Sequence, residues 1–295
     1  MALIATIFYL FYHQTMDVSI IIVSYNTSQL LKNCLNSVFE KTQGLNFEVI
    51  VVDNDSKDDS CSMLERDFSQ VKLIRSKENL GFGRANNLGM EQAKGKYLFL
   101  LNPDCLLINN SVKILYDFME NNSDCGACGG NLYDENLEKH DSFGMQTLLK
   151  DKIITHTPLK FIFPGKYKKL RGYKKDFDRT KDGEVGFITG ADLMLRKSVI
   201  DEVGNFDQRF FLFFEETELQ NRILKAGYKI FFVAESQMYH FEAKSPNPRK
   251  KLFMQRSEYI YFRITQGVLA EITVRIISLP KHLKYLLRTV IFNKA

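Results

Sequence analysis

Residues 18–26 read VSIIIVSYN, residues 47–55 read FEVIVVDND, and residues 97–104 read YLFLLNPD. Each stretch is a short, apolar, β-rich run that stops at a polar cluster. After the first run, apolar residues recur from Leu30 to Phe39 at the spacing of one helical face, and a loop at 81–87 opens a second helix. Strands and helices that alternate at this spacing predict an α/β fold with a mostly parallel sheet and helices on both faces.

The polar clusters at the strand ends form the first candidate site. They are Ser24-Tyr25-Asn26, Asp53-Asn54-Asp55 and Asn102-Pro103-Asp104. Open parallel sheets bind ligands beyond the carboxyl ends of their strands. Hydroxyl, amide and carboxylate groups should therefore meet at one edge, which predicts a nucleotide site.

A glycine-containing loop narrows the class of nucleotide chemistry. Residues 81–86 read GFGRAN, which begins like a dinucleotide fingerprint. Its third glycine is absent, and it follows a third expected strand at residues 71–74 rather than the first strand at 18–23. Nicotinamide binding is therefore disfavoured, and the sequence has no phosphate-binding motif of the P-loop type.

Composition excludes several broad classes. The chain has 295 residues, of which 45% are apolar and 25% charged, as in a globular protein of one large or two small domains. The net charge of +5 is too small to indicate a nucleic-acid partner. Five cysteines indicate a reducing compartment and no disulfide framework. Cys125 and Cys128 have no second metal-binding pair, so we interpret them as small core residues.

Positive charge is concentrated in two segments. Residues 150–181 carry 11 basic and 3 acidic side chains, and residues 244–295 carry 11 and 2. Such asymmetry suits phosphate groups or an anionic membrane surface. The C-terminal segment predicts a helix with a basic face. Its apolar face would hold Leu283, Leu286, Leu287, Val290 and Ile291, opposite Lys281, Lys284 and Arg288. This helix could lie on a membrane or dock onto the protein's own core.

The apolar N-terminal stretch, Ala2–Tyr12, is too short to span a bilayer and lacks the features of a signal peptide. We interpret residues 1–16 as an accessory flank, with Met16 as an alternative start. A short membrane-touching segment is the alternative.

The motifs, taken in order, resemble glycosyltransferase family 2. The opening of the family is matched by residues 18–26 and 51–56. Its rhamnosyltransferase-like branch is resembled by Asn79-Leu80-Gly81-Phe82-Gly83, residues 86–89 and residues 100–104. The resemblance resumes at 188–191 and 206–219, continues through Arg222, 226–228 and His240, and covers about residues 17–245.

The resemblance implies a GT-A (Rossmann-like) fold in two halves with a C-terminal helical extension. A nucleotide-sugar-binding half would occupy residues 17–130. An acceptor-binding catalytic half would occupy 131–245, with the basic insert at 150–181, and a helical region would occupy 246–295. Family members transfer a sugar from a nucleotide diphosphate with inversion, usually with Mg or Mn. The insert, expected as a loop, would cover the donor diphosphate or contact a lipid-linked acceptor, or would simply be solvated.

The family's metal and donor sites map onto specific residues. Asp104 matches the last position of a DxD-like motif whose first carboxylate is Asn102 here, and His240 would contact the metal or the diphosphate. Asp53 would contact the nucleoside and Arg84 a phosphate. Residues 190–192 would line the donor sugar or the acceptor. The full donor set is Ser24, Tyr25, Asn26, Asp53, Asn54, Gly81, Arg84, Asn102, Gly190, Ala191 and Asp192.

Inverting transfer needs a base that takes the proton of the attacking acceptor hydroxyl. Residues 214–219 read FEETEL and resemble the family's Glu-Asp-x-Asp-Leu motif. Its base position maps to Glu216, with Glu215 as the alternative. Glu replaces Asp at 216 and 218, which changes the reach of the side chains and keeps the carboxylates.

The sequence thus predicts an inverting, metal-dependent glycosyltransferase that uses a dTDP- or UDP-linked sugar, with rhamnose suggested by the branch. The acceptor would be a lipid-linked glycan of bacterial cell-surface polysaccharide synthesis, at the cytoplasmic face of the plasma membrane. The protein could also form a homo-oligomer. The alternatives are a non-catalytic nucleotide-sugar-binding subunit and a nucleotidyltransferase, although the latter needs a Gly/Lys-rich first loop that Ser24-Tyr25-Asn26 lacks.

Overall fold

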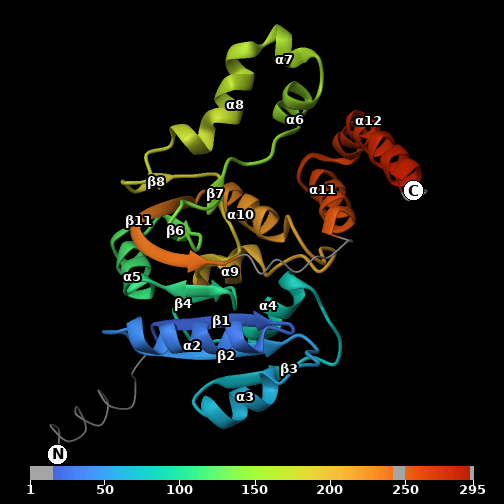
Figure 1. Ribbon diagram of the computed structural model, residues 1–295. Coiled ribbons are helices and arrows are strands. Elements are labelled where there is room, and N and C mark those ends of the chain that lie inside the picture. Colours follow the sequence, from blue (N-terminus) through green and yellow to red (C-terminus); the bar gives the residue numbers. More distant parts are fainter. Residues whose placement is uncertain (1–15, 242–249, 293–295) are drawn as a thin grey trace, which may run out of the picture.

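The structure is a computed structural model that describes residues 16–241 and 250–292, with side chains described for 16–241 and 250–280 (Figure 1). Residues 1–15 of the predicted flank at 1–16 lie outside the described backbone, and the predicted apolar face at 283–291 lies outside the described side chains. Those two interpretations stay predictions.

A mixed sheet forms the centre of the described chain. It has nine strands in the order β3-β2-β1-β4-β10-β6-β11-β5, with β8 paired to β11. The strands of the sheet are β1 (Val18–Ser24), β2 (Phe47–Asp53), β3 (Lys72–Arg75), β4 (Tyr97–Leu101), β5 (Cys105–Leu107), β6 (Cys125–Tyr133), β8 (Gly183–Glu184), β10 (Asp192–Arg196) and β11 (Lys229–His240). A separate small ribbon joins β7 (Phe143–Gly144) to β9 (Phe187–Ile188).

The N-terminal half of the sheet is parallel, as the sequence predicts. Strands β1, β2, β3 and β4 pair in parallel, and the register places Ser24 beside Asp53. Strand β10 then runs antiparallel between β4 and β6, and β11 returns parallel to β6. The α/β fold class is confirmed, and each antiparallel pair of this sheet includes β10 or β11 from the second half of the chain.

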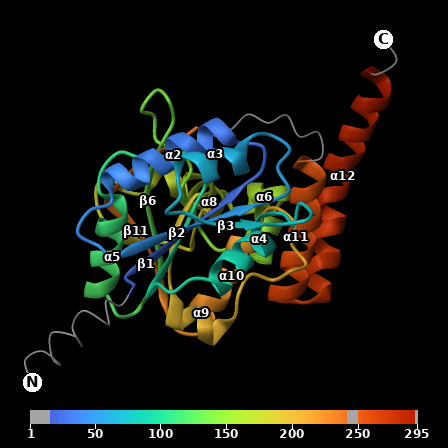
Figure 2. The same cartoon turned by 90° about the horizontal axis from the view of Figure 1, so that it is seen from below.

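Helices cover both faces of the sheet (Figure 2). One face packs on α2 (Ser28–Lys41), α3 (Ser60–Asp67) and α5 (Ser111–Asn121), and the other on α4 (Phe82–Glu91), α9 (Lys197–Val203) and α10 (Glu215–Lys225). Strand β1 shows why both faces need cover, because Ile20 and Ile22 face the first group and Ile21 the second. Cys125 and Cys128 are fully buried in β6, in line with their interpretation as core residues.

Two helical groups stand beside this body. Helices α11 (Lys250–Gln266) and α12 (Val268–Phe292) pack on each other around Tyr261 and Val274. The basic insert forms α6 (Leu149–His156), α7 (Leu159–Ile162) and α8 (Pro164–Asp176), which extend away from the sheet in Figure 1.

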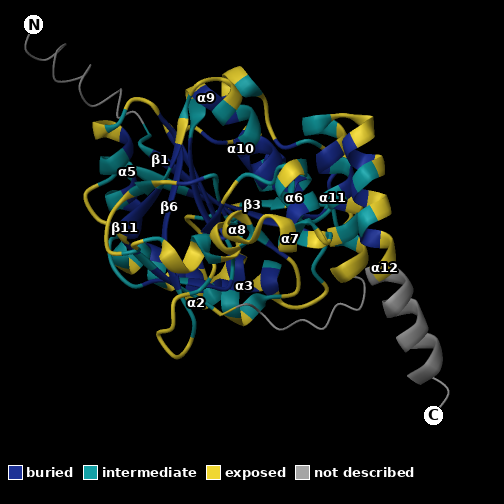
Figure 3. Cartoon of the chain, turned by 90° about the horizontal axis from the view of Figure 1, so that it is seen from above, coloured by how far each residue is buried: buried dark blue, intermediate teal, exposed yellow. Residues whose placement is uncertain are grey.

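The expectation that this insert is a loop is wrong. Pro164 occupies the first turn of α8, where its fixed φ favours a helix, and the half-buried Tyr173 packs against the core. Exposed side chains dominate the insert, as Figure 3 shows by colour. Among the described residues, no helix combines the length and apolar character that crossing a bilayer requires.

Candidate functional site

The carboxyl ends of β1 and β2 place Ser24 and Asp53 side by side. Asp53 is almost fully buried, and its Oδ2 accepts a hydrogen bond from the Ser56 N–H at 3.1 Å. Its Oδ1 is buried without a hydrogen-bond partner among the described residues. A buried carboxylate oxygen without a donor is costly, so this atom suits a ligand hydroxyl or N–H.

Tyr25 and Asn26 follow at the open end of β1. Tyr25 is 47% exposed, which leaves its ring accessible for contact with the nucleobase of a donor. Asn26 has a positive φ of 53°, and its Oδ1 accepts from the Lys57 N–H at 2.7 Å. The side chain of Asn26 therefore fixes the neighbouring loop, and its contact with a donor stays a prediction.

Asn54 and Gly81 hold the start of α4. The Asn54 Oδ1 accepts from the Leu80 N–H at 2.8 Å, and its Nδ2 donates to the Gly81 carbonyl at 3.1 Å. Gly81 has φ +80°, and a Cβ there would lie 2.0 Å from the Phe211 carbonyl oxygen. These two predicted donor residues thus seat α4 against the loop that leads to α10. The Arg84 Nε donates to the Leu80 carbonyl at 2.9 Å, which orients its guanidinium within the same loop.

The turn between β4 and β5 carries the predicted metal carboxylate. Strand β11 ends at His240, which pairs with Cys105 of β5. As a result, the His240 Nε2 lies 3.5 Å from the Asp104 Oδ1. Ligand atoms of Asp104, Cys105 and His240 all lie within 4.8 Å of one another.

The chemistry of this cluster fits a hard divalent cation. Burial raises the pKa of Cys105 well above its ordinary value, and the thiol donates to the Ala191 carbonyl at 3.5 Å, so Cys105 stays protonated. Asp104 and His240 remain as ligands, which suits Mg or Mn when phosphates and water complete the shell. The His240 Nδ1 is buried without a hydrogen-bond partner among the described residues. His140 packs edge-on against the His240 ring at 5.6 Å between centroids.

A strained turn positions the predicted base. Phe213 and Phe214 both adopt left-handed φ values, 74° and 68°, directly before α10. Such strain in non-glycine residues persists only where the surroundings enforce it. Here the Phe214 ring packs against Tyr261 of α11, with 5.4 Å between centroids. The turn places Glu215 and Glu216 at the N-terminus of α10, where negative charge is favoured.

The two carboxyl groups differ in surroundings. Glu215 is 2% exposed, and burial, followed by the charge of Glu216, raises its pKa to about 8. Desolvation also raises the pKa of the partly exposed Glu216. A raised carboxyl pKa is what a base near neutral pH requires. Glu218 is instead paired with Arg222 at 2.9 Å, which makes it a structural group.

Residues 188–191 connect the helix of the predicted base to the turn that carries the predicted metal carboxylate. Gln220, one turn after Glu216, exchanges two hydrogen bonds with the backbone of Ile188, of 2.7 and 2.8 Å. The Ala191 carbonyl then accepts from the Asn102 N–H at 3.0 Å, beside Asp104. This chain of contacts links α10 to the turn between β4 and β5 through backbone.

Gly190 and Asp192 flank this connection. A Cβ on Gly190 would lie 2.7 Å from the Phe82 ring, so the position needs a small residue. Asp192 is fully buried, and its Oδ2 accepts from the Gly130 N–H at 2.6 Å. Burial raises the pKa of Asp192 well above its ordinary value. The structure places Asp192 in the interior beneath the site, and its contact with a sugar stays a prediction.

Sequence reasoning missed His140, Cys105 and the paired left-handed residues. His140 lies in the loop after β6 and reaches His240 only through the fold, so no local pattern signals it. Cys105 could have been found by its position next to Asp104.

The mixed, mostly parallel sheet with helices on both faces is a GT-A-like fold. The chain belongs to glycosyl transferase family 2, whose model matches residues 19–204. A second model, glycosyl transferase family group 2, matches residues 167–293. The resemblance stated from the motifs is therefore confirmed.

Two relatives extend the comparison. An N-acetylglucosaminyl-diphospho-decaprenol L-rhamnosyltransferase of Mycobacterium tuberculosis is 25% identical over 238 residues, which are 77% of this chain and 76% of the relative. An uncharacterized glycosyltransferase of Bacillus subtilis is 30% identical over 241 residues, 72% of this chain and 61% of the relative.

Solved structures show the same fold. GalNAc-T7 with UDP, GalNAc and Mn²⁺ superposes with a TM-score of 0.62 and 17% identity, over 85% of this chain and 48% of that one. Staphylococcus aureus TarS superposes with a TM-score of 0.56 and 15% identity, over 89% and 42%. The chain thus spans about half the length of these proteins, or less, and the likeness concerns the fold alone.

Proposed function

We propose that this family 2 glycosyltransferase is an inverting, metal-dependent enzyme that transfers a sugar from a dTDP- or UDP-linked donor to a lipid-linked glycan. The observation that carries the proposal is the connection from the Glu216 carbonyl through the Gln220 side chain and residues 188–191 to the turn that holds Asp104, beside His240. Rhamnose is the sugar we test first, because the Mycobacterium tuberculosis relative is a rhamnosyltransferase.

In the proposed mechanism, Glu216 takes the proton of the acceptor hydroxyl as its oxygen attacks the anomeric carbon. The bond from that carbon to the diphosphate oxygen breaks, the nucleoside diphosphate leaves, and the anomeric configuration inverts. Asp104 and His240 would hold Mg or Mn, and a bound ion would neutralise charge that develops on the leaving diphosphate. The unpartnered Asp53 Oδ1 would accept a hydrogen bond from the nucleoside. Glu215, largely protonated at neutral pH, limits negative charge beside the base.

The proposal includes attachment to the cytoplasmic face of the plasma membrane, in bacterial cell-surface polysaccharide synthesis. Two exposed apolar features support it. Leu269, Ile272, Ile276 and Leu279 form a stripe along α12, at spacings of three and four residues. The second feature is the exposed apolar turn from α7 to α8 in the basic insert, which consists of Phe161, Ile162 and Phe163. An apolar surface flanked by lysines suits an anionic bilayer.

Flotation tests the membrane part. Wild type should float with vesicles that contain anionic lipid and sediment with purely zwitterionic ones. Replacing Phe161 and Phe163 by Ser should reduce flotation, whereas Leu137→Ser, at an exposed apolar residue elsewhere, should not. Equal flotation of all three proteins would contradict this part.

Transfer itself is tested by incubating the protein with Mn²⁺, dTDP-rhamnose or UDP-sugars, and N-acetylglucosamine linked through diphosphate to a short prenyl chain. Mass spectrometry should show the acceptor gain one sugar for each nucleoside diphosphate released, and NMR should show the inverted anomer. Donor binding without transfer to any acceptor would instead support a non-catalytic subunit.

A further inference from the structure

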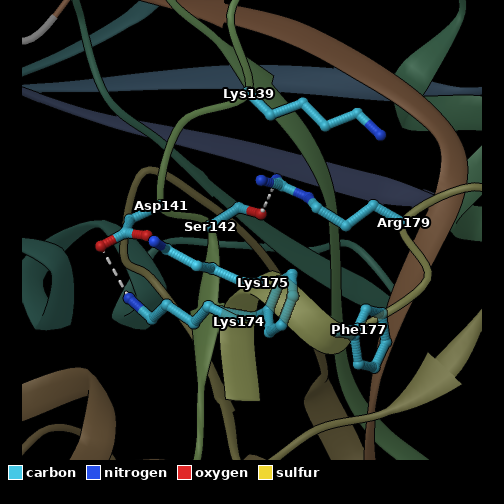
Figure 4. A pocket seen from close by; sticks show the side chains of 8 residues that line it. Lys139, Asp141, Ser142, Lys174, Lys175, Phe177 and Arg179 are labelled. Atoms are coloured by element: carbon cyan, nitrogen blue, oxygen red, sulfur yellow. Dashed lines mark hydrogen bonds and ion pairs between the residues drawn. The ribbon is translucent and has the colours of Figure 1, made fainter. Parts of the chain in front are cut away.

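A cavity of about 410 Å³ lies at the base of the insert, beside the catalytic half of the sheet. Four cationic side chains line it, Lys139, Lys174, Lys175 and Arg179, together with Asp141 and Ser142. Figure 4 shows that they come from different segments, with Lys139 from the loop after β6 and Lys174 and Lys175 from the end of α8.

The side chains that line this pocket carry more positive than negative charge. Asp141 is its one carboxylate, and it pairs with Lys174 at 2.7 Å. The remaining three cations give the pocket an excess of positive charge. Clefts with such an excess concentrate anions.

Arg179 is the strongest indication of a ligand. Its guanidinium is about half buried, and burial lowers its pKa. It donates to neutral oxygens, from Nη1 to the His140 carbonyl and from Nη2 to the Ser142 Oγ, both at 2.8 Å. Its Nε is buried with no hydrogen-bond partner among the described residues. The guanidinium also lies over the Phe143 and Phe232 rings, at 5.3 and 5.5 Å from their centroids, and the charges of Asp141 and Asp192 act on it. Because its hydrogen bonds go to neutral oxygens and its Nε is unpartnered, an oxyanion would stabilise it further, and phosphate matches its geometry.

His140 connects the segment that lines the pocket to the proposed metal cluster. His140 lies between Lys139 and Asp141 in the chain, and its ring contacts that of His240 at 5.6 Å between centroids. His240 in turn faces Asp104 at 3.5 Å. A phosphate group in the pocket would therefore lie on the catalytic side of the insert.

The same helix that lines the pocket leads to the exposed apolar tip at 161–163. Helix α8 has 13 residues between Pro164 and Asp176. At a rise of about 1.5 Å per residue, it spans about 20 Å from the tip to the pocket. A ligand with a phosphate head and an apolar tail could contact both ends of α8.

We propose that this pocket binds the diphosphate group of the lipid-linked acceptor. The inference rests on the proposed function for the identity of the acceptor. The diphosphate would lie among Lys139, Lys175 and Arg179, the prenyl chain would extend along the insert, and the acceptor sugar would point toward Glu216. The pocket would thereby select acceptors by their phosphate groups, separately from the donor diphosphate at Asp104.

The test neutralises two lysines that make no described side-chain interaction, in a Lys139→Gln, Lys175→Gln double variant. Its matched control is Lys168→Gln, Lys169→Gln, which removes the same charge from the exposed face of α8 outside the pocket. Farnesyl diphosphate is titrated calorimetrically without metal or donor. The pocket variant should bind it at least about tenfold more weakly than wild type, or about 1.4 kcal/mol, and the control should bind as wild type does. Equal binding by all three proteins would overturn the proposal.

Kinetics with two acceptors separate the acceptor from the donor. With the diphosphate-linked acceptor, the KM of the pocket variant should rise about tenfold. With the same sugar on a neutral alkyl chain, kcat/KM should match wild type within about twofold. A rise in the donor KM instead, or an equal loss on both acceptors, would overturn the proposal. The titration requires no sugar transfer, so absence of transfer by wild type would refute the proposed function while the binding result still decides the pocket.

Discussion

The His240 Nε2 lies 3.5 Å from the Asp104 Oδ1 because β11 ends beside β5, which pairs His240 with Cys105. The imidazole comes from the last strand of the sheet and the carboxylate from the turn after β4. The candidate site is therefore formed by both halves of the sheet, the parallel half that leads to Asp104 and the mixed half that ends in His240. Neither half alone places both proposed ligands.

Removing either ligand should weaken metal-dependent donor binding. Asp104→Asn and His240→Gln should each lower Mn²⁺-dependent affinity for UDP or dTDP by at least about tenfold, since even outer-sphere partners of metal ligands contribute that much. Calorimetric titration with and without Mn²⁺ measures the effect. Glu91→Gln, an exposed carboxylate at the end of α4, should behave as wild type. Unchanged affinity in both site variants would place the metal elsewhere.

Gly81→Ala should destabilise the protein by about 2 kcal/mol or more. The substituted residue would keep a φ of +80°, and its Cβ would lie 2.0 Å from the Phe211 carbonyl oxygen. Gly165→Ala is the matched control, because nothing lies within 4 Å of its Cβ. The control should be neutral or more stable by up to about 1 kcal/mol. Urea unfolding compares the two, and equal stabilities would contradict the close approach at Gly81.

The sequence predicted the parallel half of the sheet well, because each strand there is an apolar run that ends in a polar cluster. It also indicated Glu215, Glu216, Asp104 and His240 through the family motifs. It could not show that Asn54 holds the backbone of the Gly81 loop, since Asn54 meets Leu80 only in the folded chain. The insert was mistaken for a loop because its charges hide any apolar periodicity.

The raised pKa of Glu215 makes stability depend on pH. Between about pH 4.5 and 8 the folded state holds a proton that the unfolded state has lost, so the free energy of unfolding falls as pH rises. The fall is at most about 1.4 kcal/mol per pH unit. Glu215→Gln should flatten this dependence, and Glu91→Gln should leave it unchanged. Urea unfolding at pH 5, 6, 7 and 8 measures it, and an unaltered slope in Glu215→Gln would show that Glu215 titrates normally.

Activity should follow the opposite trend. Glu216 must be ionised to act as a base, and desolvation raises its pKa. The apparent pKa of the acidic limb of the kcat/KM profile should therefore lie above about 4.3, the ordinary pKa of glutamate. Activity should increase with pH through that limb. A pH–rate profile at saturating Mn²⁺ checks this. An acidic limb at or below the ordinary glutamate value would argue against Glu216 as the base.

We propose that Glu216 removes the proton of the acceptor hydroxyl and that other residues bind the donor nucleotide. The most direct measurement is the kcat of sugar transfer for Glu216→Gln, beside the affinity of the same variant for the nucleotide with Mn²⁺. We predict that kcat falls by about 10²- to 10⁴-fold while the nucleotide affinity stays within about twofold of wild type. A variant that transfers sugar at the wild-type rate, with its fold and nucleotide binding intact, would contradict the account.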